Sequence, residues 1–224
     1  MANRKTPFVI GEYYHLYNRG IDKRNIFSNQ KDVARFFKSI LEFNTLDPIG
    51  SIYENSFTKK HRLGGETSKS EKKLVDFIAY CINPNHYHFI VRQVSQRGIE
   101  KFMHRLATGY TMYFNEKEKR SGALFQGVFK SVHINSNEYL LHLSSYVNLN
   151  DRVHQLGGFT SKLVRSVSSW GEYIDKKIKG VCKKDVVLEQ FRNVDKYKEF
   201  ALSSLESIIK RKEELKDIET LLLE

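Results

Sequence analysis

The stretch Leu74–Val91, LVDFIAYCINPNHYHFIV, decides the fold because it places two histidines two residues apart inside an apolar, strand-like run. Residues i and i+2 of a strand point to the same face, so His86 and His88 are expected side by side while Tyr87 turns away. Pro84 interrupts the run just before the pair, and proline is excluded from central strands. The chain is therefore expected to bend there, with the histidines at the start of a strand.

The remaining elements follow from periodicity and from turn residues. Apolar residues at a spacing of three to four predict helices, alternation predicts strands, and polar segments with Gly and Pro predict loops. The predicted order is a strand at Glu12–Gly20, a helix at Lys31–Asn44 capped by Asn29, a polar loop insertion at 47–73, the histidine strand, a helix at Gly98–Glu116, an extended segment at Ala123–Ile134 and a helix at about Asn137–Leu149 capped by Ser136 or Asn135.

Composition points to a globular protein with a polyanionic partner. The chain has 224 residues, of which 40% are hydrophobic, enough for one core or for one core with a small appendage. Its net charge of +11 favours a partner rich in phosphates, although a solubilising excess of Lys and Arg is the alternative.

The cysteines and the N-terminus predict a cytoplasmic protein. Cys81 and Cys182 match neither a disulfide framework nor the spacing of zinc ligands, which suits a reducing compartment. The N-terminal residues MANRKTPF hold no apolar signal core, and no stretch approaches the ~20 apolar residues of a membrane span. We therefore expect neither export nor membrane insertion.

A second group of candidate residues lies in the helix that follows Ser136. Tyr146 and Asn150 are four residues apart, so a continuous helix would place them on one face. A phenol and an amide oxygen there are able to reach a phosphate bound to a metal ion, whereas a packed tyrosine with a capping asparagine is the structural alternative. Tyr110 and Tyr113 are competing nucleophiles, although their place in an apolar stripe favours packing.

Taken together, NPNHYH at 83–88 and YVNLN at 146–150 resemble the single-tyrosine HUH transposases, which carry an IS200-like transposase domain. The resemblance is greatest to the REP-associated tyrosine transposases, whose usual patterns are MPNHxH and YIxxNP. Three supporting segments occur in the family's order over roughly residues 9–205. They are HLYNRGIDKRNIF, similar to the first strand and turn; ATGYTMYFNEKEKRSGALFQGVFKS, similar to the middle helix and hairpin; and SVSSWGEYI, similar to a serine-rich segment near the C-terminus.

The resemblance implies an α+β fold: a ferredoxin-like, mostly antiparallel sheet of four or five strands with packed helices. Residues 1–155 would form the HUH catalytic domain, and residues 156–224 a C-terminal helical extension packed on it or appended to it. The helix from about Val194 to Leu223 would pack on the body, bind DNA through Lys210, Arg211 and Lys212, or pair with another copy.

The resemblance also assigns roles to single residues. His86, His88 and Asn150 would hold Mg²⁺ or Mn²⁺, and Tyr146 would be the nucleophile. Zinc is a weaker alternative because no cysteine or second histidine pair completes a tetrahedron. The chain departs from the family pattern at Ile82, where leucine is common, at Asn83, where the family has Met, and at Asp151, where it has Pro.

The implied function is metal-dependent cleavage and joining of single-stranded DNA through a 5′-phosphotyrosine, at hairpin-forming sequences, by a monomer or a homodimer. Two alternatives remain open. One is a nucleic-acid-binding protein that keeps the fold without turnover, and the other is a metal-dependent phosphodiesterase that uses water.

Basic residues in two places are candidates for contacting the DNA strand. His15 and Arg19 lie in the first predicted strand, a segment that the resemblance places near the active site, and a structural salt bridge is the alternative role for this arginine. The other candidates lie in and after the turn NEKEKRSG, for which a solvated turn is the alternative; they are Lys117, Lys119, Arg120 and Lys130.

Overall fold

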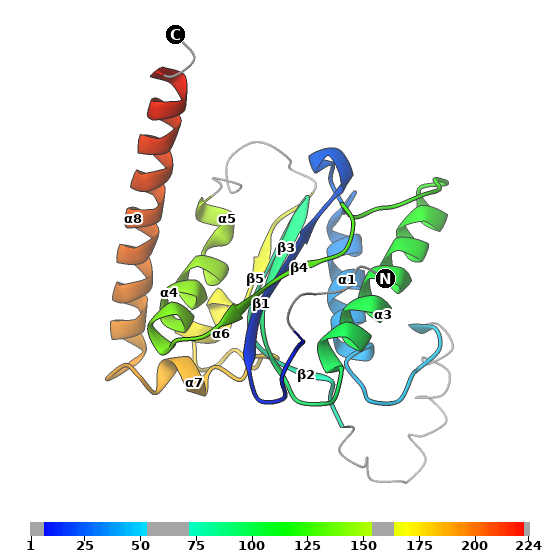
Figure 1. Cartoon of the computed structure of the whole chain (residues 1–224), viewed down its shortest axis with the longest axis horizontal. Coiled ribbons are helices and arrows are strands. Elements are labelled where there is room, and N and C mark those ends of the chain that lie inside the picture. The colour runs from blue at the N-terminus through cyan, green and yellow to red at the C-terminus, as the bar shows by residue number, and fades with distance from the viewer. Residues whose placement is uncertain (1–6, 53–71, 154–163, 222–224) are drawn as a thin grey trace.

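A computed structural model describes residues 7–52, 72–153 and 164–221 and shows an antiparallel five-stranded sheet with helices on both faces (Figure 1). Its strands, in the spatial order β4-β1-β3-β2-β5, are β1 (Tyr13–Arg19), β2 (Val75–Asn83), β3 (His86–Gln93), β4 (Lys130–Ile134) and β5 (Val167–Ser168). The helices are η1 (Ile21–Lys23), α1 (Gln30–Glu42), α3 (Gly98–Lys117), α4 (Asn137–Asn148), α5 (Asn150–Val153), α6 (Trp170–Ile174), α7 (Asp185–Leu188) and α8 (Val194–Leu221).

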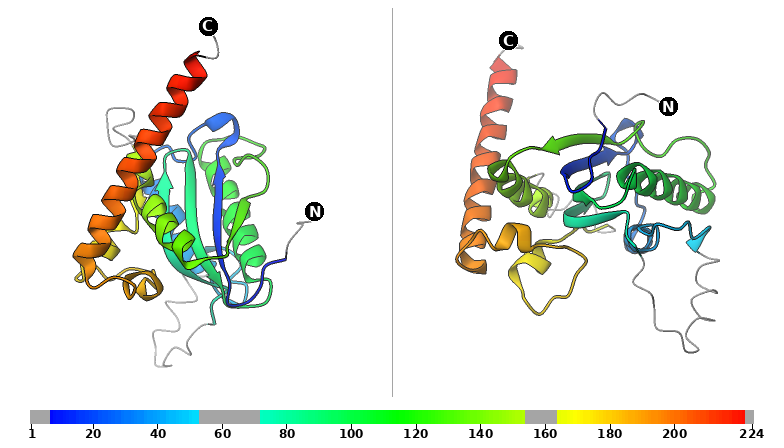
Figure 2. Two further views of the ribbon diagram at one scale, coloured as in Figure 1. Left: turned by 60° about the vertical axis from the view of Figure 1, so that its left-hand side comes forward. Right: turned by 60° about the horizontal axis from the view of Figure 1, so that its bottom comes forward.

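The order of elements from β1 to β4 is that of a ferredoxin-like fold. The chain runs β1-α1-β2-β3-α3-β4, and these four strands lie in the order β4-β1-β3-β2. Helices α1 and α3 cover one face of the sheet, and α4 and α8 lie on the other side (Figure 2). The predicted fold class is confirmed.

Alternation along the strands divides the core into two parts. Leu16 and Phe89 are fully buried on the face that packs against α1 and α3. Ile90 is fully buried on the opposite face, together with residues of α4 and α8. Alternate residues of each central strand enter one core or the other. The strands are therefore fixed by apolar packing on both faces, and the polar side chains on the α4 face keep fixed positions.

The histidine stretch forms a tight hairpin rather than one strand. Asn83 at the end of β2 pairs with His86 at the start of β3, which leaves Pro84 and Asn85 as the turn. The turn is fixed from outside, since the Ile26 amide donates to the Pro84 carbonyl at 2.9 Å and the Gly20 amide to the Asn85 carbonyl at 2.8 Å. The predicted bend before the histidines is confirmed.

The predicted helix through Tyr146 and Asn150 is interrupted. Helix α4 ends at Asn148, and α5 begins at Asn150. Leu149 between them has φ −113° and ψ 17°, yet its amide still donates to the Ser145 carbonyl at 3.0 Å. The two helices are therefore joined by a single non-helical residue, and the prediction of one continuous helix was wrong at this point.

The C-terminal part of the described chain packs on the tyrosine-bearing helix. Helix α8 lies along α4 (Figure 1), and its Tyr197 and Ala201 are fully buried there. The Asn148 side chain donates to the Tyr197 hydroxyl at 2.8 Å, and the Ser169 hydroxyl donates to the Asn148 amide oxygen. Most of the predicted loop insertion, at 53–71, and residues 154–163 lie outside the described residues.

Candidate functional site

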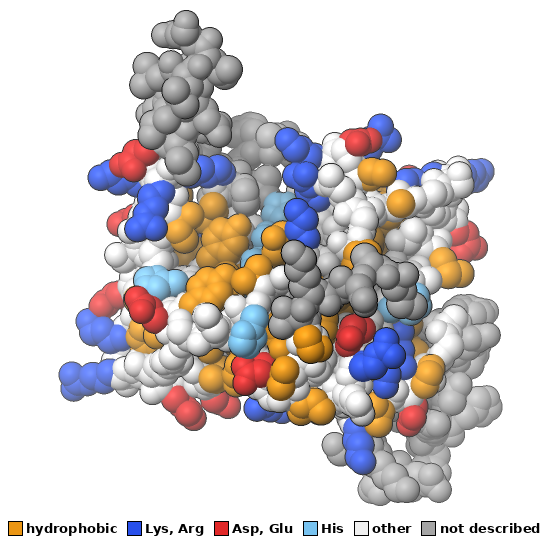
Figure 3. Space-filling view, viewed as in Figure 1, with side chains coloured by type: hydrophobic (Ala, Val, Ile, Leu, Met, Phe, Trp, Pro, Cys, Tyr) orange, Lys and Arg blue, Asp and Glu red, His pale blue; other side chains and the backbone are white. Residues whose placement is uncertain are grey.

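The site lies on the α4 face of the sheet, where strand register gathers the polar residues. His86 pairs with Arg19 of β1 and with Asn83 of β2, and His88 pairs with Tyr17, so these side chains share one face. Helix α4 brings Tyr146 onto them, with its ring 5.5 Å from the His88 ring and nearly perpendicular to it. In the space-filling view, histidine side chains lie beside hydrophobic ones here, with Lys and Arg side chains nearby (Figure 3).

His86 and Asn150 face each other despite the break at Leu149. The Nε2 atom of His86 is 3.1 Å from the Oδ1 atom of the fully buried Asn150. The other ring nitrogen of His86 lies 2.6 Å from the Asn85 amide oxygen, and the Asn85 amide nitrogen donates to the Lys23 carbonyl. That orientation of Asn85 makes His86 Nδ1 the donor and leaves the lone pair of Nε2 directed at Asn150.

The spacing of His86 Nε2 and Asn150 Oδ1 matches that of two neighbouring ligands of an octahedral divalent cation. Neighbouring ligands around Mg²⁺, each about 2.1 Å from the ion, lie about 3 Å from one another. The 3.1 Å between His86 Nε2 and Asn150 Oδ1 matches that separation. Within residues 7–52, 72–153 and 164–221, no three His, Cys, Asp or Glu side chains are arranged to hold a metal ion. A metal site here therefore requires amide oxygens, which suit Mg²⁺ or Mn²⁺ better than zinc.

His88 is held by a histidine of the first strand. Its Nδ1 atom lies 2.9 Å from Nε2 of His15, and the Tyr17 ring stacks on it with centroids 5.6 Å apart. Burial lowers the pKa of His15 to about 4, so this imidazole is neutral at physiological pH. A neutral imidazole is able to fix the orientation of His88 without repelling a cation.

Tyr146 is half-buried against this cluster. Burial raises the pKa of its phenol, and the neighbouring Asn150 side chain partly offsets that rise. Burial likewise lowers the pKa of His86, and the Asn150 oxygen, which accepts a hydrogen bond only when Nε2 carries a proton, opposes that effect. At neutral pH, therefore, the site presents a protonated phenol beside the neutral imidazoles of His15 and His86.

The competing tyrosines of α3 lie on the other face of the sheet. Tyr110 is fully buried, and its hydroxyl donates to the Ile26 carbonyl at 2.8 Å. The Tyr113 hydroxyl donates to Asp32 at 2.9 Å. Both residues pack in the core between α1 and α3, so only Tyr146, of these three tyrosines, accompanies the histidines.

Two of the predicted DNA-contacting residues lie beside the site. Arg19 is exposed, pairs in register with His86 and forms a hydrogen bond with the Gln126 side chain. Lys130 is exposed at the start of β4, opposite Tyr17. The structure therefore brings both side chains to the strand ends that carry the histidine pair.

The other three basic candidates follow α3 and have different surroundings. The Lys117 ammonium is 2.8 Å from the buried carboxylate of Asp32, so it is engaged in an ion pair. Arg120 donates to the Ala123 carbonyl at 2.9 Å, and Lys119 is exposed in a left-handed conformation with φ 49°. Their proposed role in binding DNA stays a prediction.

Asp151, which stands where the family has Pro, occupies the first turn of α5. It is half-buried, and burial raises the pKa of its carboxyl group. A raised pKa favours the neutral form of the carboxyl group, which does not repel phosphate.

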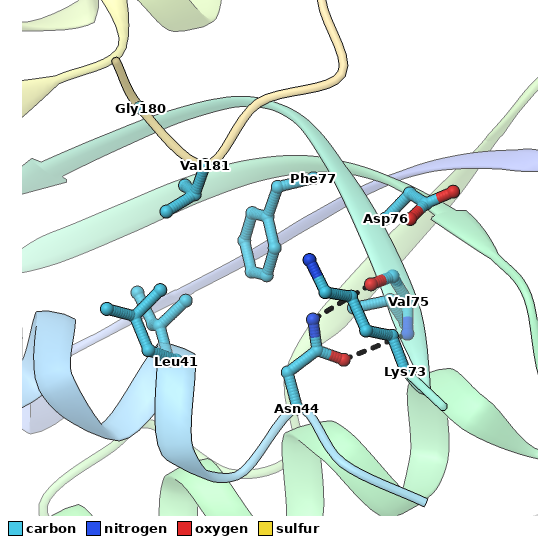
Figure 4. Close-up of a pocket in the computed structure, with 9 residues that line it drawn as sticks. Leu41, Asn44, Lys73, Val75, Asp76, Phe77, Gly180 and Val181 are labelled. Atoms are coloured by element: carbon cyan, nitrogen blue, oxygen red, sulfur yellow. Dashed lines mark hydrogen bonds between the residues drawn. The ribbon is translucent and has the colours of Figure 1, made fainter. Parts of the chain in front are cut away.

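A hollow on the opposite side of the sheet has structural surroundings (Figure 4). Leu41 of α1 and Phe77 of β2 line it, together with Asn44, which is hydrogen-bonded to both the amide and the carbonyl of Val75. Asp76 also lines it, but its carboxylate pairs with Arg92 at 2.7 Å. The side chains of Asn44 and Asp76 are thus occupied in holding the start of β2.

One family model matches a segment of the chain. The family model described as "Transposase IS200 like" matches residues 66–150, a segment that contains the histidine pair, Tyr146 and Asn150. Residues 66–150 belong to the IS200-like transposase family. The match associates this segment with DNA-processing transposases.

Among solved structures, the chain is similar to a REP-associated tyrosine transposase bound to a REP hairpin. The TM-score is 0.48 at 12% sequence identity, over 81% of this chain and 90% of the other. No curated protein sequence matches the transposase significantly. In the part of the chain that the structure describes, no helix is both long enough and apolar enough to cross a membrane.

Sequence reasoning did not identify every residue of the site. His15 was placed near the site only through the family resemblance, and its contact with His88 was not predicted. Asn83 was noted only as a departure from the family pattern, although it lies 2.9 Å from His86 Nε2. Strand alternation was the available signal for both, but it needs the register of β1 and β2 against β3, which the sequence does not show.

Proposed function

We propose that this transposase cuts and rejoins single-stranded DNA through a covalent bond between Tyr146 and a 5′ phosphate, with the help of a divalent cation. The observation that carries the proposal is the contact of Tyr146 with His88 of the histidine pair on one face of the sheet. Its ring lies 5.5 Å from that of His88 and 6.5 Å from that of His15.

His86, His88 and Asn150 would hold Mg²⁺ or Mn²⁺. Such an ion supplies Lewis acidity, which neutralises charge on the non-bridging oxygens of a bound phosphate. The protein fixes the ligands beforehand: Asn85 holds the ring of His86, and His15 holds the ring of His88. Ligands that are already oriented lose little freedom when the ion binds.

Tyr146 would carry out the covalent step. Its phenolic oxygen attacks phosphorus, and the bond from phosphorus to the 3′ oxygen of the preceding nucleotide breaks. The phenol loses one proton to solvent, and the departing oxygen takes one up to become a 3′-hydroxyl, so no charge or electron is left over. The phosphotyrosine bond keeps the free energy of the phosphodiester, and another 3′-hydroxyl is able to reverse the step without ATP.

The surface beside the site suits a single strand better than a duplex. Arg19 and Lys130 provide positive charge for phosphates, and Val132 exposes apolar surface on the neighbouring β4. Flexible single strands bind through such a mixture of charge and flat apolar contacts. We therefore propose single-stranded DNA, including strands that flank a hairpin, as the substrate.

The test is formation of a covalent adduct between the transposase and labelled DNA. The protein is incubated with pools of single-stranded hairpin DNA and Mn²⁺ or Mg²⁺, and a denaturing gel resolves the products. We expect an adduct that requires the metal and is lost in Tyr146→Phe. Tyr139→Phe, a change of the same kind in the same helix, is the matched control and should keep the adduct.

Other outcomes identify the alternatives. Cleavage without an adduct, unchanged in Tyr146→Phe, would indicate a phosphodiesterase that uses water. An adduct that persists in Tyr146→Phe would assign the reaction to a different nucleophile. DNA binding with no cleavage of any hairpin pool would favour a binding protein that keeps the fold.

A further inference from the structure

Asn83 lies between two of the proposed metal ligands. Its amide Nδ2 atom is 2.8 Å from Asn150 Oδ1 and 2.9 Å from His86 Nε2. The distance from His86 Nε2 to Asn150 Oδ1 is 3.1 Å. Three polar atoms from β2, β3 and α5 therefore form a nearly equilateral triangle.

We infer that Asn83 is an additional ligand of the metal ion, so that the site combines two amide oxygens with the histidine pair. The inference rests on the proposed function for the presence of the ion, and it adds a residue at which the chain departs from its family's motif. Asn83 occupies the last position of β2, where strand pairing places its side chain beside that of His86.

The triangle has the dimensions of one face of an octahedron. Ligands about 2.1 Å from Mg²⁺ and at right angles to one another are about 3 Å apart. The three measured separations, 2.8, 2.9 and 3.1 Å, all lie close to that value. An ion above this triangle would bind one imidazole and two amides, and its remaining positions would be left for His88, phosphate or water.

The amide of Asn83 must turn to become a ligand. Without an ion, its Nδ2 group donates hydrogen bonds to Asn150 and His86. A half-turn about the last side-chain bond exchanges the nitrogen and the oxygen at almost unchanged positions. The Oδ1 atom now 3.5 Å from the Cys81 sulfur would move to the ion, and the NH₂ group would face that sulfur, a weak acceptor.

Burial keeps both amides in place to bind an ion instead of each other. Asn83 and Asn150 are both fully buried, so neither amide is able to move away into solvent. The Asn150 Nδ2 atom is buried without a hydrogen-bond partner among the described residues, which shows that Asn150 is oriented by its oxygen. An ion shared by both oxygens would satisfy the groups that now face each other.

Two substitutions of Asn83 distinguish a role as a metal ligand from a role as a hydrogen-bond donor. In Asn83→Asp, a carboxylate oxygen is a stronger ligand for Mn²⁺ than an amide oxygen, but an ionised carboxylate has no proton to donate to His86 or Asn150. In Asn83→Leu, a side chain of similar size offers neither. We expect Mn²⁺ to bind about tenfold more tightly to Asn83→Asp and about tenfold more weakly to Asn83→Leu.

The measurement is isothermal titration of the full-length protein with Mn²⁺ alone, beside circular dichroism and thermal unfolding in EDTA to confirm that each variant is folded. Gln126→Glu is the charge-matched control, because the exposed Gln126 side chain is hydrogen-bonded to Arg19 beside the site and not to a proposed ligand. It adds the same charge nearby, so we expect a gain of no more than about threefold from electrostatic attraction.

Each contrary result overturns the inference in a recognisable way. Weaker Mn²⁺ binding by Asn83→Asp would show that Asn83 is only a hydrogen-bond donor to the ligands. Equal gains in Asn83→Asp and Gln126→Glu would show an effect of charge alone, and unchanged binding in the two Asn83 variants would remove the residue from the site. Absence of Mn²⁺ binding by the wild-type protein would instead refute the metal site in the proposed function.

Discussion

His15 orients a proposed ligand without binding the ion itself. Its Nε2 atom contacts Nδ1 of His88 at 2.9 Å, and it is almost completely buried. A histidine ligand whose second nitrogen is held in this way keeps one ring orientation, and loss of such a partner commonly weakens metal binding 10–100-fold. The role of His15 is therefore that of a positioning residue.

Two substitutions of His15 separate its hydrogen bond from its volume. His15→Phe keeps a ring but removes the bond to His88, and we expect Mn²⁺ binding to weaken by about tenfold or more. His15→Gln places an amide near the position of Nε2, so it should recover most of the affinity. Calorimetric titration with Mn²⁺ measures both effects. Equal affinities for His15→Phe and the wild-type protein would contradict the assigned role.

Single residues differ in how far the sequence reveals their place. The histidine pair was predictable because alternation within one strand fixes which side chains share a face. The contacts of His15 and Asn83 were not, because they depend on which residues of β1 and β2 lie opposite β3. His15 and His88 lie 73 positions apart in the chain, and Asn83 and Asn150 lie 67 apart, so these contacts form only when the sheet and α5 have come together.

Among the elements, α1 and α3 are tied together by one buried carboxylate. Asp32 of α1 is completely buried and accepts hydrogen bonds from the Lys117 ammonium and the Tyr113 hydroxyl of α3. Burial alone would raise the pKa of Asp32, but hydrogen bonds from Lys117, from the Ser28 amide and from Tyr113 outweigh it and lower the pKa. The ionised form is therefore the one that the fold stabilises.

The lowered pKa of Asp32 predicts how stability changes with pH. Its contribution is fully present above the unfolded pKa, near 4, and is lost as pH falls through the lower folded value. Urea unfolding between pH 7 and pH 3 should show the free energy of unfolding decreasing below about pH 4. In Asp32→Asn this part of the decrease should be absent, and an identical pH dependence in the two proteins would contradict the assignment.

Lys117→Met removes the cation from the same pair and tests the ion pair at neutral pH. Loss of one partner leaves a buried carboxylate uncompensated, and we expect the free energy of unfolding to fall by about 2 kcal/mol, since Lys117 is partly exposed. Lys119→Met, two residues further along, is the control and should change stability by less than about 0.5 kcal/mol. Equal losses of stability in both variants would show that the ion pair of Lys117 with Asp32 does not stabilise the fold.

Helix periodicity gave the bounds of α1 and α3 to within a few residues, because long amphipathic patterns are strong signals. It failed at Leu149, where the pattern continues across the end of α4. The tertiary contacts of Asn148 with Tyr197 and Ser169, and of Asn150 with His86, fix the residues on either side. Local sequence carries no information about these contacts.

At the scale of the whole molecule, one chain supplies every residue of the proposed site. Helix α4 follows β4 directly, and its Tyr146 reaches the histidines of the same chain. Two inactive variants, Tyr146→Phe and His86→Ala, should therefore form no adduct with DNA when they are mixed. If two chains exchanged their tyrosine helices, the mixture would regain an adduct, carried by the His86→Ala chain, on the gel described above.

The overall architecture was predictable because the family resemblance implied a ferredoxin-like fold, whereas the strand and helix patterns alone did not separate the two strands of the β2–β3 hairpin. The short β5 and the packing of α8 on α4 were less predictable. β5 has two residues, too few to show alternation. The amphipathic pattern of α8 indicates that one face is buried, but it does not indicate that α4 is the partner.

The hydrogen bonds of Asn148 affect the order in which the proposed site is completed during synthesis of the chain. Asn148 lies two residues beyond Tyr146, and its partner Tyr197 lies 49 residues further along. Ribosomes deliver the chain from its N-terminus, so the sheet and its histidines emerge while the support for the tyrosine helix is still missing. A nascent chain therefore holds the proposed metal ligands of β3 before it holds a firmly placed nucleophile, and DNA near the ribosome meets a finished site only after α8 has been made.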